Sequence, residues 1–277
     1  GLGDVYKRQY LVNSSVNIAS NIKMSGPQTG DAKITTTSAS AILFRSSSAT
    51  NITIENLVID GGNVAGRGLA GGTGTELCNF GNTSNIRIYN CVFQNNRYMG
   101  VAIAGGCNNV YITGCEFTAL GNTLVTIEGG PCIWCDGKTS PVYNLRIENN
   151  YFHDNNWSAA YFMPNGGSFS NNMCVSNMES TVFIGDGFNL KLENNYIYNN
   201  KRKYIAGCGF EIGNCNNVSI VGNVIRNCDD TALSFDQVDG NIQDVVVTGN
   251  VFMNNGQDTS YYPYAGGINF TNITGTY

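Results

Sequence analysis

The feature of this sequence that most constrains its fold is a twelve-residue repeat, in which alternating apolar residues are followed by Asn-rich positions. Eight copies align: "NITIENLVIDGG" (51–62), "NIRIYNCVFQNN" (85–96), "NVYITGCEFTAL" (109–120), "NLRIENNYFHDN" (144–155), "GGSFSNNMCVSN" (166–177), "NLKLENNYIYNN" (189–200), "NVSIVGNVIRNC" (217–228) and "DVVVTGNVFMNN" (244–255). Successive copies start 22 to 35 residues apart. Such a period with variable insertions predicts a solenoid, whose coils pack mainly against their neighbours.

The coils are predicted to be built from strands. Apolar residues alternate with polar ones, as in Leu145/Ile147 and Leu190/Leu192, and this period of two is typical of β-strands. Another short strand precedes most copies, for example "CIWC" (132–135), "AYFM" (160–163), "TVFI" (181–184) and "GFEI" (209–212). We therefore expect a parallel β-helix of about nine coils with little helix. Leucine-rich repeats and propeller blades do not fit this pattern.

The paired asparagines are predicted to stack inside the solenoid. The second member of the pair is Asn in five consecutive copies, at Asn150, Asn172, Asn195, Asn223 and Asn250. Equivalent residues of neighbouring coils lie about 4.8 Å apart, so their amides can bond along the axis. An unpaired buried amide would cost about 1–3 kcal/mol, which favours an uninterrupted run.

These repeats resemble those of right-handed parallel β-helix proteins of the pectin-lyase-like superfamily, over residues 10–277. The resemblance implies one all-β, single-stranded right-handed parallel β-helix and a secreted or cell-surface protein. The first nine residues, "GLGDVYKRQ", resemble a translated sequencing adapter and are set aside. Because the repeat also stops abruptly at Tyr277, we expect the domain to be truncated at both ends.

Composition limits the classes of binding partner that this chain is expected to have. The net charge of −5 and the pI of about 4.8 disfavour nucleic acid, which binds basic surfaces. No apolar run is long enough to span a membrane. The superfamily includes pectate lyases, polygalacturonases, alginate-active enzymes, tailspikes and non-catalytic repeat proteins, so the resemblance points to a polysaccharide or glycan partner without fixing an activity.

The ten cysteines are expected to be mostly buried thiols. Cys78, Cys91, Cys115 and Cys174 stand where other copies carry apolar residues or Asn. Cys91 and Cys115 belong to adjacent coils and are near enough to form a disulfide. With one His in the chain, a four-ligand zinc site is disfavoured.

A row of aromatic residues is predicted on one outer face. The residues that we expect to face outward in the preceding strands are Leu43, Asn79, Ala102, Trp134, Phe162, Phe183, Glu211, Ser234 and Asn269. Trp134, Phe162 and Phe183 would then form a stripe that binds a glycan. Two alternatives stay open: a loop such as 118–131 could cover the stripe, or a register shift of one residue would reverse every face.

Acidic residues are predicted beside this stripe. Glu211 and Asp236 would lie about 8 Å apart, given the spacings within and between strands. That value is within the range of about 6.5–9.5 Å for the two carboxyl groups of inverting glycosidases. The alternative is that they are surface acids without a role.

The segment "NCDDTALSF" (227–235) resembles the double-Asp segment of polygalacturonases, which makes Asp229 and Asp230 further catalytic candidates. It departs from that pattern, because no Gly-His-Gly or Arg-Ile-Lys follows and the single His, His153, lies upstream. The same acids could bind Ca²⁺. Pectate lyases pair such calcium with a basic residue, which Lys201, Arg202 or Lys203 could supply, and Lys203 is the candidate for contacting substrate. A solvated loop is the alternative.

Two classes of function remain. One is a polysaccharide lyase or glycoside hydrolase that works in a groove on this face. The other is a non-catalytic β-helix, such as an adhesin, a tailspike-like segment or a surface repeat protein. The residues identified form only part of a catalytic set, so catalysis stays undecided at this point.

Overall fold

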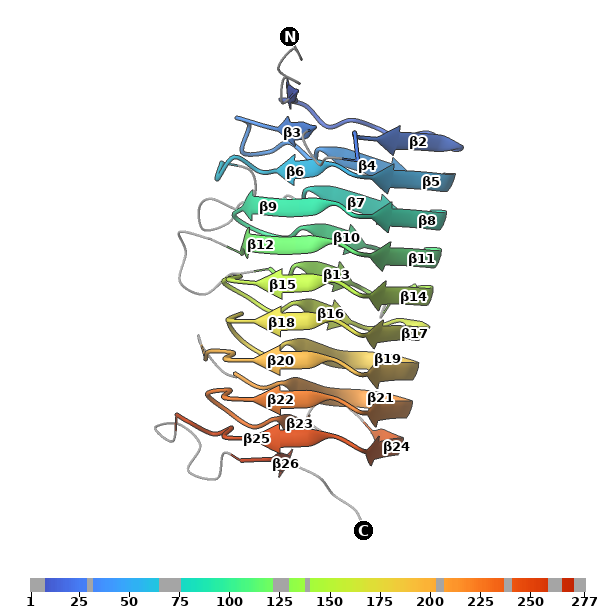
Figure 1. Cartoon of the computed structure of the whole chain (residues 1–277). Helices are drawn as coiled ribbons and strands as arrows, with labels where there is room; N and C mark the ends of the chain where they lie inside the picture. Colours follow the sequence, from blue (N-terminus) through green and yellow to red (C-terminus); the bar gives the residue numbers. More distant parts are fainter. Residues whose placement is uncertain are drawn as a thin grey trace.

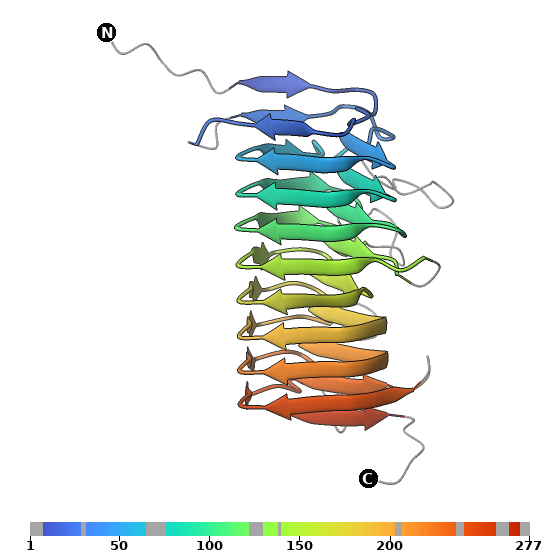
Figure 2. The same cartoon turned by 90° about the vertical axis from the view of Figure 1, so that its right-hand side faces the viewer.

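The computed structural model describes residues 8–28, 32–64, 76–121, 130–137, 140–202, 207–236, 241–258 and 266–271. Every described strand pair is parallel, and successive coils lie on one another along a single axis (Figures 1 and 2). This arrangement confirms the predicted all-β parallel solenoid. In the described part of the chain, no helix is long and apolar enough to cross a membrane.

Three rows of strands form three outer faces. Face 1 consists of β4 (Phe44–Ser47), β7 (Cys78–Gly81), β10 (Val101–Ile103), β13 (Ile133–Cys135), β16 (Ala160–Phe162), the first part of β19 (Val182–Glu193), the first part of β21 (Phe210–Val221), β23 (Leu233–Asp236) and β26 (Ile268–Thr271). Face 2 consists of β2 (Ile22–Ser25), β5 (Thr50–Glu55), β8 (Ser84–Tyr89), β11 (Asn108–Thr113), β14 (Tyr143–Glu148), β17 (Asn165–Ser170), the second parts of β19 and β21, and β24 (Ile242–Thr248). Because β19 and β21 run through the corner between them, faces 1 and 2 belong to one sheet.

The third face is a separate sheet. It consists of β1 (Gln9–Leu11), β3 (Lys33–Thr35), β6 (Val58–Asp60), β9 (Val92–Asn96), β12 (Glu116–Leu120), β15 (Tyr151–His153), β18 (Met173–Val175), β20 (Tyr196–Tyr198), β22 (Val224–Arg226) and β25 (Val251–Met253). Of the segment set aside as adapter-like, residues 1–7 lie outside the described residues. Gln9 pairs with Lys33 in this sheet.

The Asn pairs turn the chain from face 2 to face 3. The first member has a left-handed backbone, as in Asn149 (φ 59°) and Asn194 (φ 56°), and Gly114 and Gly222 replace it in other copies. Asn and Gly adopt this conformation more readily than other residues. After such a turn the second member points inward, which explains why the two asparagines of a pair have different roles.

The second members form a buried column of amides. Each Nδ2 donates to the Oδ1 of the next coil, with distances of 3.1, 3.2, 2.9 and 2.9 Å for the four steps from Asn150 through Asn172, Asn195 and Asn223 to Asn250. The backbone N–H beside each donor bonds to the same oxygen. A second buried pair, Asn155 and Asn177, repeats the amide bond one corner further on (2.8 Å). These bonds provide partners for buried polar groups at the corners.

Apolar side chains fill the space between the three faces. Phe117 stacks between Phe93 and Phe152 of the adjacent coils, with ring centroids 4.9 and 4.7 Å apart. Gly167 replaces the Leu that neighbouring coils carry, because a Cβ there would lie 2.2 Å from the Leu145 carbonyl oxygen. All ten cysteines are buried free thiols. Burial raises the pKa of the Cys135 thiol to about 12, which keeps it protonated.

Candidate functional site

The outward residues of face 1 form one row along the helix axis. Strand register aligns Arg45, Asn79, Ala102, Trp134, Tyr161, Phe183, Glu211, Ser234 and Asn269 on consecutive coils. Trp134, Phe183 and Glu211 are therefore in the row where the sequence placed them. At about 4.8 Å per coil, the three aromatic rings cover about 10 Å.

The sequence-based orientation of two residues is wrong. Phe162 is fully buried and its neighbour Tyr161 occupies the outward position, paired with Trp134 and Phe183. The apolar pattern was ambiguous here. Ala160 faces inward but is too small to mark the core side of the strand, and an amphipathic Tyr can face outward. Leu43 is also buried, and Arg45 takes its place in the row.

The aromatic part of the row is packed by its neighbours. The rings of Tyr161 and Phe183 lie 5.1 Å apart at 51°. Trp157, at the corner before β16, donates its indole N–H to the Tyr161 hydroxyl (3.3 Å). Burial raises the pKa of Tyr161, and the nearby carboxyl groups of Glu211 and Glu179 add to this effect. The Tyr161 phenol therefore stays neutral and can hydrogen-bond a ligand hydroxyl.

Glu211 is the most unusual titratable group of the row. Burial raises the pKa of its carboxyl group, and the nearby carboxylates of Asp236, Glu179 and Asp230 raise it further. The Ser180 hydroxyl donates to Glu211 Oε2 (2.5 Å) and opposes this shift only in part. Glu211 thus holds its proton at a higher pH than an ordinary glutamic acid, as a general acid must.

Asp236 lies one coil further on, displaced along the strand. Glu211 pairs with Ser234, and Asp236 is two residues after Ser234 on the same outward side, since Phe235 points into the core. The spacings between coils and along a strand put the Cα atoms of the two acids about 8 Å apart. In inverting glycosidases the two carboxyl groups are about 6.5–9.5 Å apart, which leaves room for a water molecule.

Asp229 and Asp230 belong to a cluster of ion pairs at the corner before β23. Asp229 accepts from Lys201 Nζ and from the Arg202 backbone N–H, both at 3.1 Å. Asp230 accepts from an Arg202 guanidinium nitrogen (3.2 Å) and from the Thr231 N–H (2.8 Å), while the other end of the guanidinium reaches Asp258 (3.1 Å). The double-Asp segment therefore fastens the loop that carries Lys201 and Arg202. Lys203, the candidate for contacting substrate, lies outside the described residues.

This cluster does not fit a calcium ion. All four carboxylate oxygens of Asp229 and Asp230 already accept a hydrogen bond from a protein donor. Ca²⁺ needs six to eight oxygen ligands. Across the described ranges, no group of three or more His, Cys, Asp or Glu residues could hold a metal ion.

Three contributors to the site went unnoticed in the sequence. Glu179 and Ser180 precede β19, and Trp157 stands in the equivalent corner before β16. The signal was available, because aligning the preceding strands on their inward residues also aligns these corners.

The family model for the right handed beta helix region matches residues 131–275, just over half of the chain. The chain belongs to this family. The predicted right-handed parallel β-helix is thereby confirmed. No curated protein sequence matches the chain.

Solved β-helix structures share the fold of this chain at low identity. PfbA, a surface adhesin of Streptococcus pneumoniae, is 18% identical over 88% of this chain and 69% of its own, with a TM-score of 0.66. The tailspike protein of E. coli bacteriophage HK620 is 15% identical over 98% of this chain and 52% of its own, with a TM-score of 0.73. The periplasmic alginate epimerase AlgG is 8% identical over 96% and 79%, with a TM-score of 0.52. This right-handed β-helix chain spans about half the length of the tailspike chain.

Proposed function

We propose that this protein is a secreted or cell-surface β-helix protein that binds a neutral polysaccharide along face 1 and hydrolyses it there. One observation carries the proposal: Glu211, with a raised pKa, lies in line with Trp134, Tyr161 and Phe183, and Asp236 follows on the next coil. Aromatic rings offer flat apolar surfaces for sugar rings, and the two acids supply a proton donor and a proton acceptor.

The chemistry follows the inverting scheme for two carboxyl groups. Protonated Glu211 gives its proton to the glycosidic oxygen as the bond between that oxygen and the anomeric carbon breaks. Asp236 takes a proton from a water molecule, whose oxygen bonds to the anomeric carbon from the opposite side. Glu211 ends ionised and Asp236 protonated, and exchange with solvent restores both.

The charge around Glu211 favours a neutral glycan over an acidic one. The neighbouring carboxylates raise the pKa of Glu211, so the electrostatic potential at this position is negative. A ligand carboxylate would be repelled by the same groups. Lyase chemistry on a uronate has less support. The resemblance to pectate lyases would need Ca²⁺ at Asp229 and Asp230, and both acids are ion-paired with basic residues.

A non-catalytic role as a glycan-binding surface protein is the second candidate. It is favoured by the ion pairs of Asp229 and Asp230. These two acids match the double-Asp segment of polygalacturonases, and here they are paired with Lys201 and Arg202. It needs the same aromatic row and no proton transfer. Known surface proteins with this fold include an adhesin and a tailspike.

The deciding experiment is a screen of the chain against neutral and acidic polysaccharides, with binding and products measured together. New reducing ends without ultraviolet absorbance indicate hydrolysis, unsaturated products indicate a lyase, and binding without products indicates a binding protein. Glu211→Gln should abolish hydrolysis and leave binding intact. Glu116→Gln on face 3 is the matched control and should change neither. No binding of any neutral glycan would refute the proposal.

A further inference from the structure

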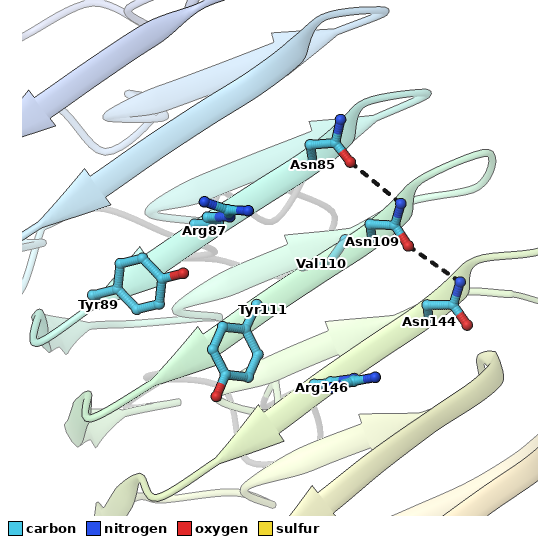
Figure 3. Close-up of a pocket in the computed structure, with 8 residues that line it drawn as sticks. All are labelled: Asn85, Arg87, Tyr89, Asn109, Val110, Tyr111, Asn144 and Arg146. Atoms are coloured by element: carbon cyan, nitrogen blue, oxygen red, sulfur yellow. Dashed lines mark hydrogen bonds between the residues drawn. The ribbon is translucent and has the colours of Figure 1, made fainter.

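Face 2 carries an open depression of about 530 Å³ that the activity proposed for face 1 does not involve. Its lining comes from β8, β11, β14 and the turns before them: Asn85, Arg87, Tyr89, Asn109, Val110, Tyr111, Asn144 and Arg146 (Figure 3). None of these residues is acidic. In a chain of net charge −5, a depression lined by two arginines and no acid is a distinct feature.

Six of the lining residues form two parallel rows, because the strands are in register. Arg87 pairs with Tyr111, and Tyr111 pairs with Arg146, so the two arginines stand on the coils on either side of Tyr111. They are two coils apart, which is about 10 Å. Beside them, Asn109 donates to Asn85 and accepts from Asn144, both at 3.2 Å, and this bonded row forms one border (Figure 3).

The Tyr111 ring is fixed by two contacts, whereas the guanidinium groups of Arg87 and Arg146 are exposed to solvent. The Tyr111 hydroxyl donates to Glu148 (3.2 Å), and Tyr89 packs edge-on against the Tyr111 ring, with centroids 5.8 Å apart. Arg87 and Arg146 are both exposed. Within the described ranges, neither guanidinium has an ion-pair or hydrogen-bond partner, so their donors are available to a ligand.

The depression continues along the axis toward the C-terminal coils. A second hollow of about 330 Å³ shares Asn144 and Arg146 with the first and extends to Lys191. In the outward row, basic residues stand on every second coil, in the order Arg87, Tyr111, Arg146, Ser168, Lys191. The second hollow also contains Glu148 and Glu193, which balance its positive charge, so the acid-free Arg87–Arg146 section is where an anion would bind.

We propose that the Arg87–Tyr111–Arg146 section of face 2 binds an acidic oligosaccharide, with one sugar ring on Tyr111 and ligand carboxylates on the two guanidinium groups. Arginine binds carboxylates through two parallel hydrogen bonds, and a held aromatic ring gives a sugar a flat surface. The amide row offers partners for sugar hydroxyls. This binding goes beyond the function proposed for face 1 and does not depend on it.

A saccharide fits this section better than a nucleic acid does. Nucleic-acid surfaces need many basic residues because affinity comes mainly from phosphate contacts. Here two guanidinium groups stand in an acidic protein, with glutamates bordering the next section. A linear ligand with widely spaced carboxylates meets these charges without a phosphate at every step.

The test is calorimetric titration of the whole chain with a tetramer of a hexuronic acid. The matched neutral tetramer, a sulfated oligosaccharide of equal length and a single-stranded DNA oligomer are the comparison ligands. We expect the uronate tetramer to bind, and Arg87→Gln with Arg146→Gln to weaken it at least about tenfold, the usual cost of losing charge-assisted hydrogen bonds. Arg8→Gln with Arg97→Gln removes the same charge away from faces 1 and 2 and should leave the affinity unchanged.

Further variants separate this proposal from the function of face 1. Tyr111→Ala should weaken binding, whereas Tyr111→Phe keeps the ring and should retain most of it. Glu211→Gln should not alter uronate binding at all, so failure at one face can be told from failure at the other. The proposal is overturned if the uronate does not bind, if the Arg87/Arg146 pair can be replaced without loss, or if the neutral, sulfated or DNA ligand binds as tightly.

Discussion

Faces 1 and 2 are two halves of one sheet, joined through β19 and β21, yet their outward residues differ in kind. On face 1 the polar groups have protein partners, such as Ser180 with Glu211 and Arg202 with Asp230, and the local potential is negative. On face 2 the guanidinium groups of Arg87 and Arg146 are open to solvent, and no acid lines the depression between them.

The contrast shows how a solenoid separates folding from recognition. Inward residues must pack against, or hydrogen-bond to, the equivalent residues of the neighbouring coils, so they repeat as Ile, Leu, Phe or Asn. Outward residues repeat in space but not in type, because each is freed from packing. Two faces of one scaffold can therefore present opposite charges at different coils, and each can be altered without changing the other.

The largest expected effect tests the chemistry of face 1. Glu211→Gln should reduce hydrolysis of the neutral glycan by about 10²–10⁴-fold, the usual contribution of a general acid. The wild-type rate should fall as pH rises through the raised pKa of Glu211, because the active form is protonated. Rate measurements across pH would show this limb, and it should be absent from the residual activity of the variant.

Stability provides the control for that result. Because burial raises the folded-state pKa of Glu211, its contribution to stability is fully present below its unfolded pKa and declines as pH rises toward the folded value. Glu211→Gln removes this ionisation and should not destabilise the protein at neutral pH. A large drop in melting temperature would mean that Glu211 serves the fold, which would contradict the proposed role.

The next effect concerns the core that both faces share. Asn195→Leu leaves the Asn172 backbone N–H and the Phe169 carbonyl without their amide partners. We expect a loss of about 1–3 kcal/mol for each buried group left unpaired, measured by denaturant unfolding.

The neighbouring residue supplies the matched control for this loss. Asn194 has φ 56°, and Asn194→Gly should cost far less because Gly tolerates that backbone. If both variants unfold alike, the buried column is not what distinguishes the two members of a pair. If Asn195→Leu impairs binding at one face only, the two faces do not share a cooperative core.

The repeat made most of the fold predictable, because a period of two and a paired Asn are local signals that each coil repeats. Which side chains of a strand face inward was harder to predict. Ala160 is small and gives a weak apolar signal, so the sequence predicted Phe162 in the outward position that Tyr161 occupies. Face 2 escaped notice for a different reason. Arg87, Tyr111 and Arg146 stand at positions where any polar residue fits a strand. Only the paired coils show that they meet around one depression.

Exchanging the aromatic residues tests whether the faces bind independently. Trp134→Ala should weaken binding of the neutral glycan about tenfold, because it removes stacking area from a partly exposed outward position without touching the core. Tyr111→Ala should weaken binding of the uronate by a similar factor. Each variant should leave the other ligand unaffected in titrations, and a loss of both ligands from either change would show that the two faces are one site.

The smallest effect is the response to salt, and it distinguishes the faces without any mutation. Arg87 and Arg146 are exposed, so their attraction for ligand carboxylates is screened as the Debye length falls from about 10 Å at 0.1 M to about 3 Å at 1 M. Uronate affinity at face 2 should therefore fall severalfold over this range. Neutral glycan binding at face 1 involves no ligand charge and should change little. The same titrations at both salt concentrations suffice, and equal salt dependence at the two faces would remove the electrostatic difference on which their comparison rests.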